Sequence, residues 1–88
     1  MNIDTYKFKE YMLSKRYTLS YVKNIIYVLD TYLLEVSLED VLNCPDATVI
    51  VERVLKRRYS SHDNVCCRIL KTLHYVADYY RDSRKHTL

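Results

Sequence analysis

The chain contains no glycine, and Pro45 is the only proline among its 88 residues. Tight β-hairpin turns need positive φ angles, which glycine adopts at the lowest cost. A β-rich domain of this length would need several such turns. The composition therefore favours an all-α fold, and the length allows one small domain with a compact core.

The clearest helical pattern is a stripe of apolar side chains in the last third of the sequence. Its members recur at spacings of three and four residues, as on the buried face of a helix. They are Val65, Cys66, Ile69, Leu70, Leu73, Val76, Ala77 and Tyr80. A similar stripe consists of Val22, Ile25, Ile26, Leu29 and Leu33. Both stripes predict long helices that pack in the core.

Capping residues divide the chain into segments. The candidate N-caps are Asp4 or Thr5, Thr18, Ser37, Asp46 and Ser60. Asp63 follows Ser60 by three residues, a spacing that resembles a capping box. The expected helices cover residues 5–14, 18–35, 37–43, 47–57 and 61–82. The β-branched run at 48–51 locally favours a strand, but a single strand would have no partner. We expect a bundle of four main helices and one short helix, followed at 83–88 by a basic tail or linker start.

Charge is unevenly distributed along the chain, although the net charge is only +3. Residues 30–52 contain six of the 11 acidic residues and no Lys or Arg, so the 14 basic residues share the rest with five acids. This distribution indicates a basic face directed at a polyanion, with the acidic segment turned away. The alternative is a solvated surface with uneven charge.

The three cysteines do not suggest a disulfide framework, because their number is odd and Cys66 and Cys67 are adjacent. This cysteine usage indicates a reducing, cytoplasmic environment. No signal peptide is visible, and the apolar run 25–29 is too short to span a membrane.

Metal binding and catalysis have little support in the sequence. His62 and Cys66 have a spacing that can hold zinc, but the other Cys and His residues follow no ligand pattern. Paired carboxylates, a Gly-rich phosphate loop and a hydrolase elbow are all missing. We expect no metal, no other cofactor and no catalysis by this chain alone.

Two of the expected helices begin directly after a group of cations. Lys15 and Arg16 precede Thr18, and the basic run 56–58 precedes Ser60. A helix start offers free backbone N–H groups and a partial positive charge, so added cations favour a bound phosphate. We expect the two openings to lie side by side on one surface and to bind the same polyanion.

Two segments carry a pattern known from one protein family. The first, F-x-x-Y-(M/L)-L-S-K-x-Y-(T/S) before a long helix ending in Y-L, is carried by Phe8, Tyr11, Met12, Leu13, Ser14, Lys15, Tyr17, Thr18, Tyr32 and Leu33. The second is carried by Leu38, Asp40, Val41, Tyr59, Ser60, Ser61, Val65, Ile69, Leu70, Leu73 and Tyr80. Together they resemble the core-binding domain of the tyrosine recombinases, the phage-integrase family, over about residues 6–80.

The resemblance implies a four-helix, SAM-like module that clamps duplex DNA at a recombination site, its second and fourth helices approaching the major groove. In that family the catalytic residues, including the nucleophilic tyrosine, lie in a separate domain. This chain is therefore not expected to be an enzyme. The implied partners are double-stranded DNA and a catalytic domain encoded after it in the same gene. The implied setting is DNA integration by a mobile element, with a monomeric module at the nucleoid.

The residues and the resemblance together give two groups of DNA contacts. Phosphate contacts are expected from Lys15, Arg16, Thr18, Arg57, Arg58, Ser60 and Ser61. For Thr18 and Ser60 the other possible role is helix capping. Base-edge contacts are expected from Ser20, Tyr21, Lys23, Asn24, His62, Asn64, Arg68 and Lys71, for which the alternative is a solvated helix face.

A different class of function stays open. A small helical adaptor domain could dock a protein through its tyrosine-rich surface or through the acidic segment 30–52. Binding through a mainly apolar interface would respond weakly to salt, whereas DNA binding would weaken steeply. A third alternative is a fragment without activity of its own.

Overall fold

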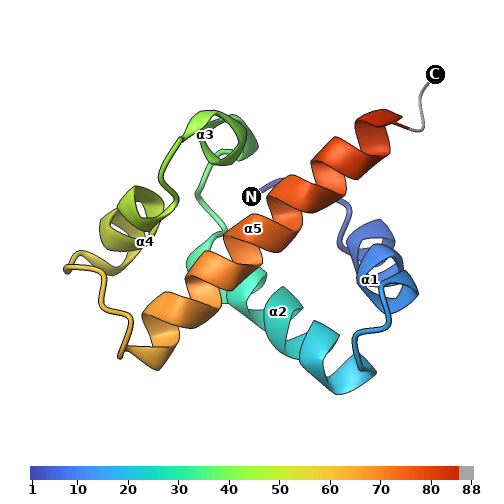
Figure 1. Cartoon of the computed structure of the whole chain (residues 1–88), viewed down its shortest axis with the longest axis horizontal. Helices are drawn as coiled ribbons and strands as arrows, with labels where there is room; N and C mark the ends of the chain where they lie inside the picture. The colour runs from blue at the N-terminus through green and yellow to red at the C-terminus, as the bar shows by residue number, and fades with distance from the viewer. Residues whose placement is uncertain (86–88) are drawn as a thin grey trace.

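The computed structural model describes residues 1–85, and the side chains of residues 1–83, as five α-helices (Figure 1). They are α1 (Thr5–Ser14), α2 (Leu19–Tyr32), α3 (Leu38–Asn43), α4 (Thr48–Leu55) and α5 (Asn64–Lys85). No strand occurs within the described residues, so the predicted all-α class is confirmed. None of the helices in this part of the chain has the length and apolar character needed to cross a membrane.

The long helix α5 is the element around which the others pack. It contacts each of the other four helices, most extensively α2, and runs diagonally across the front of the molecule in Figure 1. Its buried face consists of Cys66, Ile69, Thr72, Leu73, Val76 and Ala77. The predicted apolar stripe of this helix is therefore confirmed. Thr72 joins that face because its hydroxyl donates to the Arg68 carbonyl oxygen at 2.8 Å, which satisfies the buried polar group.

The two N-terminal helices complete this core. Phe8 and Met12 of α1 are fully buried, and α2 buries Val22, Ile25, Val28 and Leu29. Helix α1 packs against both α2 and α5. The β-branched run at 48–51 is helical, as predicted, because Ile50 and Val51 reach the same core. Tertiary packing thus overrides its local strand propensity.

Three predicted helix boundaries were wrong. Helix α2 ends at Tyr32 and not near residue 35, because a turn over residues 33–36 buries both Leu33 and Val36. Helix α4 ends at Leu55 and not near residue 57, because Lys56 adopts a left-handed conformation with φ 56°. Helix α5 begins at Asn64, three residues later than expected.

The predicted tail was also partly wrong. Residues 83–85 continue α5 as regular helix, so the domain does not stop at residue 82. The rest of that segment, residues 86–88, lies outside the described residues.

Helix α1 ends in a left-handed residue without the help of glycine. The Arg16 N–H donates to the Leu13 carbonyl at 3.0 Å, and the Tyr17 N–H donates to the Met12 carbonyl at 3.4 Å. This is the hydrogen-bond pattern of a Schellman motif, in which glycine is the usual left-handed residue. Here Arg16 takes that position with φ 71° and remains exposed. A cation is thereby fixed just before the start of α2.

Candidate nucleic-acid interface

Helices α2 and α5 border a groove, which we call the α2–α5 groove. Its walls are formed by Tyr21, Asn24, Ile25, Tyr27, Val28, Tyr32, Val65, Arg68 and Lys71. Four of these residues belong to the predicted base-contacting group, two from each helix: Tyr21, Asn24, Arg68 and Lys71. The fold thus brings polar side chains from two distant segments onto one surface.

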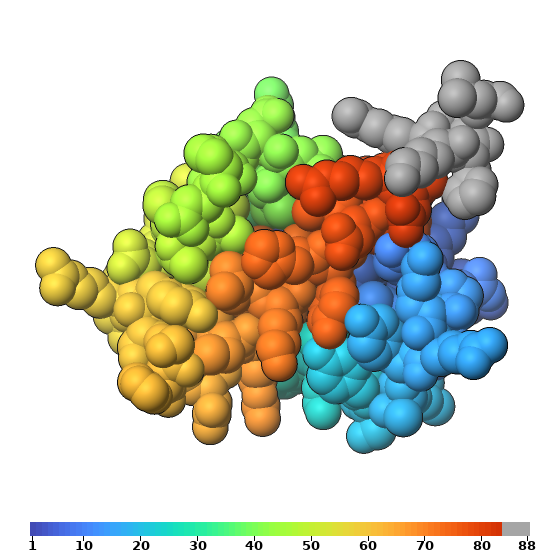
Figure 2. Space-filling model, viewed as in Figure 1, coloured from blue at the N-terminus to red at the C-terminus, as the bar shows by residue number. Residues whose placement is uncertain are grey.

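The two helices that border the groove share one edge of the molecule. Helices α2 and α5 cross, and both begin at the lower edge of the view in Figure 1. The first turns of α5, in orange, and the cyan surface of α2 meet along this edge in Figure 2. The connection before α2 lies at the right and the connection before α5 at the left (Figure 1). The two helix openings therefore share an edge but lie at its two ends, and not side by side as predicted.

At the opening of α2, Thr18 has the expected capping role. Its hydroxyl accepts a hydrogen bond from the Tyr21 N–H at 3.2 Å. Lys15 is directed elsewhere, because its ammonium group lies 3.6 Å from the Asp82 carboxylate and 5.4 Å from the centre of the Tyr11 ring. Lys15 therefore helps join α1 to the end of α5, and Arg16 is the cation next to the α2 start that no ion pair holds within the described residues.

At the opening of α5 the predicted capping box was wrong. The Ser60 hydroxyl accepts from the His62 N–H at 3.2 Å, within the connection and not at the helix start. Asp63 is the residue that caps α5, since its carboxylate accepts from the Val65 N–H at 3.0 Å and the Cys66 N–H at 3.3 Å. Hydrogen bonds from these backbone groups, the Cys66 N–H foremost, lower the pKa of Asp63.

Asp63 also changes the charge of this opening. Its carboxylate pairs with the Arg57 guanidinium at 2.7 Å. The start of α5 is therefore already occupied by an anion, and a phosphate placed there would meet a carboxylate. Arg58, next to this pair, is exposed and belongs to no ion pair in the described part of the chain.

Tyr21 is held by a cluster of tyrosines at the α1, α2 and α5 contact. Its hydroxyl lies 2.8 Å from the Tyr75 hydroxyl, and its ring stacks on Tyr17 with centroids 5.5 Å apart. Burial, followed by hydrogen bonding to Tyr21, raises the pKa of Tyr75. A second tyrosine contact, between Tyr11 and Tyr79, lies nearer the end of α5. The predicted contact of Tyr21 with DNA can therefore involve only the ring surface that faces the groove.

The other predicted DNA-contacting residues lie outside the groove lining. Ser20, Lys23, Ser61, His62 and Asn64 are all exposed. Lys23 instead borders a hollow between α1 and α2, together with Lys9 and Tyr6. The structure gathers four of the fifteen predicted side chains in one groove and distributes the others around it.

Sequence reasoning missed two tyrosines of the groove, Tyr27 and Tyr32. Tyr27 has 64% of its surface exposed. It follows Asn24 by three residues on the same helix, and this spacing could have indicated a shared face.

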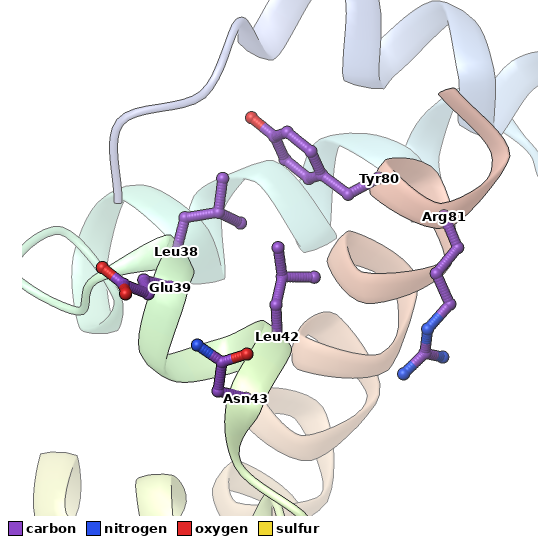
Figure 3. A pocket seen from close by; sticks show the side chains of 6 residues that line it. All are labelled: Leu38, Glu39, Leu42, Asn43, Tyr80 and Arg81. Atoms are coloured by element: carbon purple, nitrogen blue, oxygen red, sulfur yellow. The ribbon is translucent and has the colours of Figure 1, made fainter. Parts of the chain in front are cut away.

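The molecule carries a further hollow on a different side, between α3 and α5. Leu38, Leu42 and Tyr80 point into it, with Glu39, Asn43 and Arg81 at its rim (Figure 3). Helix α3 lies at the top of Figure 1, away from the lower edge where α2 and α5 begin. No group of three His, Cys, Asp or Glu side chains suited to a metal ion occurs among the described residues. His62 is exposed and Cys66 buried, so these two do not form a common site.

In comparisons with known proteins, the chain matches no family model, no curated protein and no solved structure.

Proposed function

We propose that this chain is a DNA-binding module that grips duplex DNA through the α2–α5 groove and the cations beside it. One observation carries the proposal: Arg68 and Lys71 of α5 line the same groove as Asn24 of α2. Arginine and lysine suit guanine edges and phosphates, and asparagine suits adenine edges. A protein surface that presents all three together matches the chemistry of a DNA groove.

The charges around the groove support this assignment. Arg16, Arg58, Arg68 and Lys71 are exposed, and no ion pair within the described residues neutralises them. Cations without a carboxylate partner can neutralise phosphates without first breaking a protein contact. Arg16 at one end of the edge and Arg58 at the other are suited to phosphates on either side of a groove.

Among the described residues, no acidic side chain lines the groove. Glu39 and Asp40 belong to α3, and Asp40 pairs with Arg53 of α4 at 3.3 Å. Helix α3 is at the opposite edge of Figure 1 from the starts of α2 and α5. A polyanion that enters the groove therefore meets Arg68 and Lys71, while the Asp63 carboxylate at the α5 opening is paired with Arg57.

We infer further that the module is of the tyrosine-recombinase core-binding, SAM-like type. The supporting features are the family-like segments in the sequence and an arrangement in which the second and the last long helix both begin at the proposed DNA edge. Strand exchange would then need a catalytic domain on another part of the same gene product.

The adaptor alternative has less support. Six of the ten tyrosines, at positions 11, 17, 21, 75, 79 and 80, contact one another within the fold. Part of the surface of each of these rings is therefore used for intramolecular packing and is not available to a protein partner.

The proposal is tested by fluorescence anisotropy with a labelled duplex over a range of salt concentrations. The double variant Arg68→Ala/Lys71→Ala should lose at least about 10-fold in affinity at low salt and show a shallower dependence on salt. Both side chains are exposed, so its unfolding free energy should stay within about 0.5 kcal/mol of the parent chain.

The matched control is Lys7→Ala/Lys9→Ala on α1, which removes the same charge away from the groove. It should reduce affinity far less. Equal losses in the two double variants would mean that binding follows net charge alone, and absence of duplex binding by the parent chain at low salt would remove the proposal.

A further inference from the structure

We propose that the α2–α5 groove holds an unpaired nucleobase, so that the protein prefers DNA with a single-stranded stretch over fully paired duplex. The inference rests on the proposed function, because the same cations position the DNA backbone. Its own basis is the set of three tyrosines, Tyr21, Tyr27 and Tyr32, that line the groove with Arg68 and Lys71.

The groove has the composition of a single-strand site. Proteins that bind unpaired nucleic acid combine aromatic rings, on which bases stack, with cations that follow the backbone. The base edges of duplex DNA are read mainly by polar groups, and a stacked base pair offers no open ring face. A site that only reads base edges does not require three tyrosines. A site on which unpaired bases stack does use such rings.

Tyr21 supplies a fixed ring. It is stacked on Tyr17 and hydrogen-bonded to Tyr75, so the position of its ring is set before any ligand arrives. A ring held in place loses little conformational freedom on binding, which favours affinity.

Tyr27 supplies an accessible ring at the groove rim. It is 64% exposed, and none of the ring contacts found within the described residues involves it. The polar groups beside the rings complete the site. Asn24 can bond a base edge, while Arg68 and Lys71 can reach the adjoining phosphates.

The size of the groove agrees with a ligand of this kind. Its volume is about 260 Å³, below the roughly 300–1,000 Å³ of pockets for drug-sized molecules. A groove of this size is suited to a single base of an extended nucleic-acid strand.

The experiment compares three labelled DNAs by anisotropy: a fully paired duplex, the same duplex with a short single-stranded gap, and the gap strand alone. The parent chain should bind the gapped duplex about 10-fold or more tightly than the paired one. Tyr27→Ala should remove this preference, whereas Tyr27→Phe, which keeps the ring, should retain it.

The control variant is Tyr6→Ala on α1, because Tyr6 is as exposed as Tyr27, at 68%. It should leave all three affinities unchanged. Equal binding of paired and gapped duplex, or a preference that survives Tyr27→Ala, would overturn the inference while the duplex-binding function stands. Failure to bind any of the three DNAs would overturn both.

Discussion

Single residues at the α5 opening decide how the helix starts and what its end can bind. Asp63 accepts two backbone N–H groups and pairs with Arg57, whereas Ser60 bonds only within the preceding turn. The sequence predicted Ser60 as the cap and Asp63 as its partner three residues later, but both residue types fit an N-cap. The structure assigns the cap to Asp63, which also holds Arg57. Lys56 and Arg58 of this connection are exposed and in no ion pair within the described residues.

This assignment predicts that replacing Asp63 lowers the stability of the fold more than replacing Ser60. Asp63→Ala should lower the free energy of unfolding by roughly 1 kcal/mol, the usual cost of losing an N-cap. Ser60→Ala, a surface change in a turn, should stay within about 0.5 kcal/mol. Urea unfolding measures both, and Asp63→Asn is the control because asparagine also caps well. A larger cost for Ser60→Ala than for Asp63→Ala would contradict the assignment.

At the scale of elements, the predicted helices are those whose apolar spacing is regular. The stripe of α5 and the N-terminal cap of α2 at Thr18 followed directly from residue type and spacing. The ends of the helices could not be predicted in this way, because they depend on hydrogen bonds that residue spacing does not reveal. Lys56 ends α4 in a left-handed conformation, which residue type does not favour for lysine.

Hydrogen bonds of tyrosine hydroxyls join α1 and α2 to α5, so the stability of the fold should depend on pH in the alkaline range. Tyr11 donates to the Asp82 carboxylate at 2.7 Å, and burial together with this bond raises its pKa. Burial and the Tyr21 hydroxyl raise the pKa of Tyr75. Because these values lie above the unfolded value of about 10, the stabilisation is complete below that pH and is lost as pH rises further.

We therefore expect the melting temperature to fall above about pH 10. Tyr75→Phe, which cannot ionise, should flatten this fall. Tyr27→Phe should leave it unchanged, because Tyr27 is exposed. The measurement is thermal unfolding by circular dichroism between pH 8 and pH 11. An identical alkaline fall in Tyr75→Phe and the parent chain would contradict the account.

At the scale of the whole molecule, the fold sorts the predicted DNA contacts into those that can act together and those already engaged. Asn24, Arg68 and Lys71 meet because α2 and α5 cross. Lys15 and Arg57 have carboxylate partners, and the Lys15 pairing with Asp82 joins segments 67 residues apart. The spacing of Asn24, Arg68 and Lys71 along the chain predicts that they lie on helix faces. No local sequence pattern predicts an ion pair between residues as distant as Lys15 and Asp82.

We propose above all that nucleic acid binds this protein at the α2–α5 groove. The most direct measurement is a titration of isotope-labelled protein with a short duplex at low salt, followed by backbone amide chemical shifts. The account predicts that the largest shift changes cluster at residues 16–28 and 58–71, and that those of α3 and α4 stay nearly constant. Shift changes concentrated on α3 and α4, with the groove residues unmoved, would contradict it.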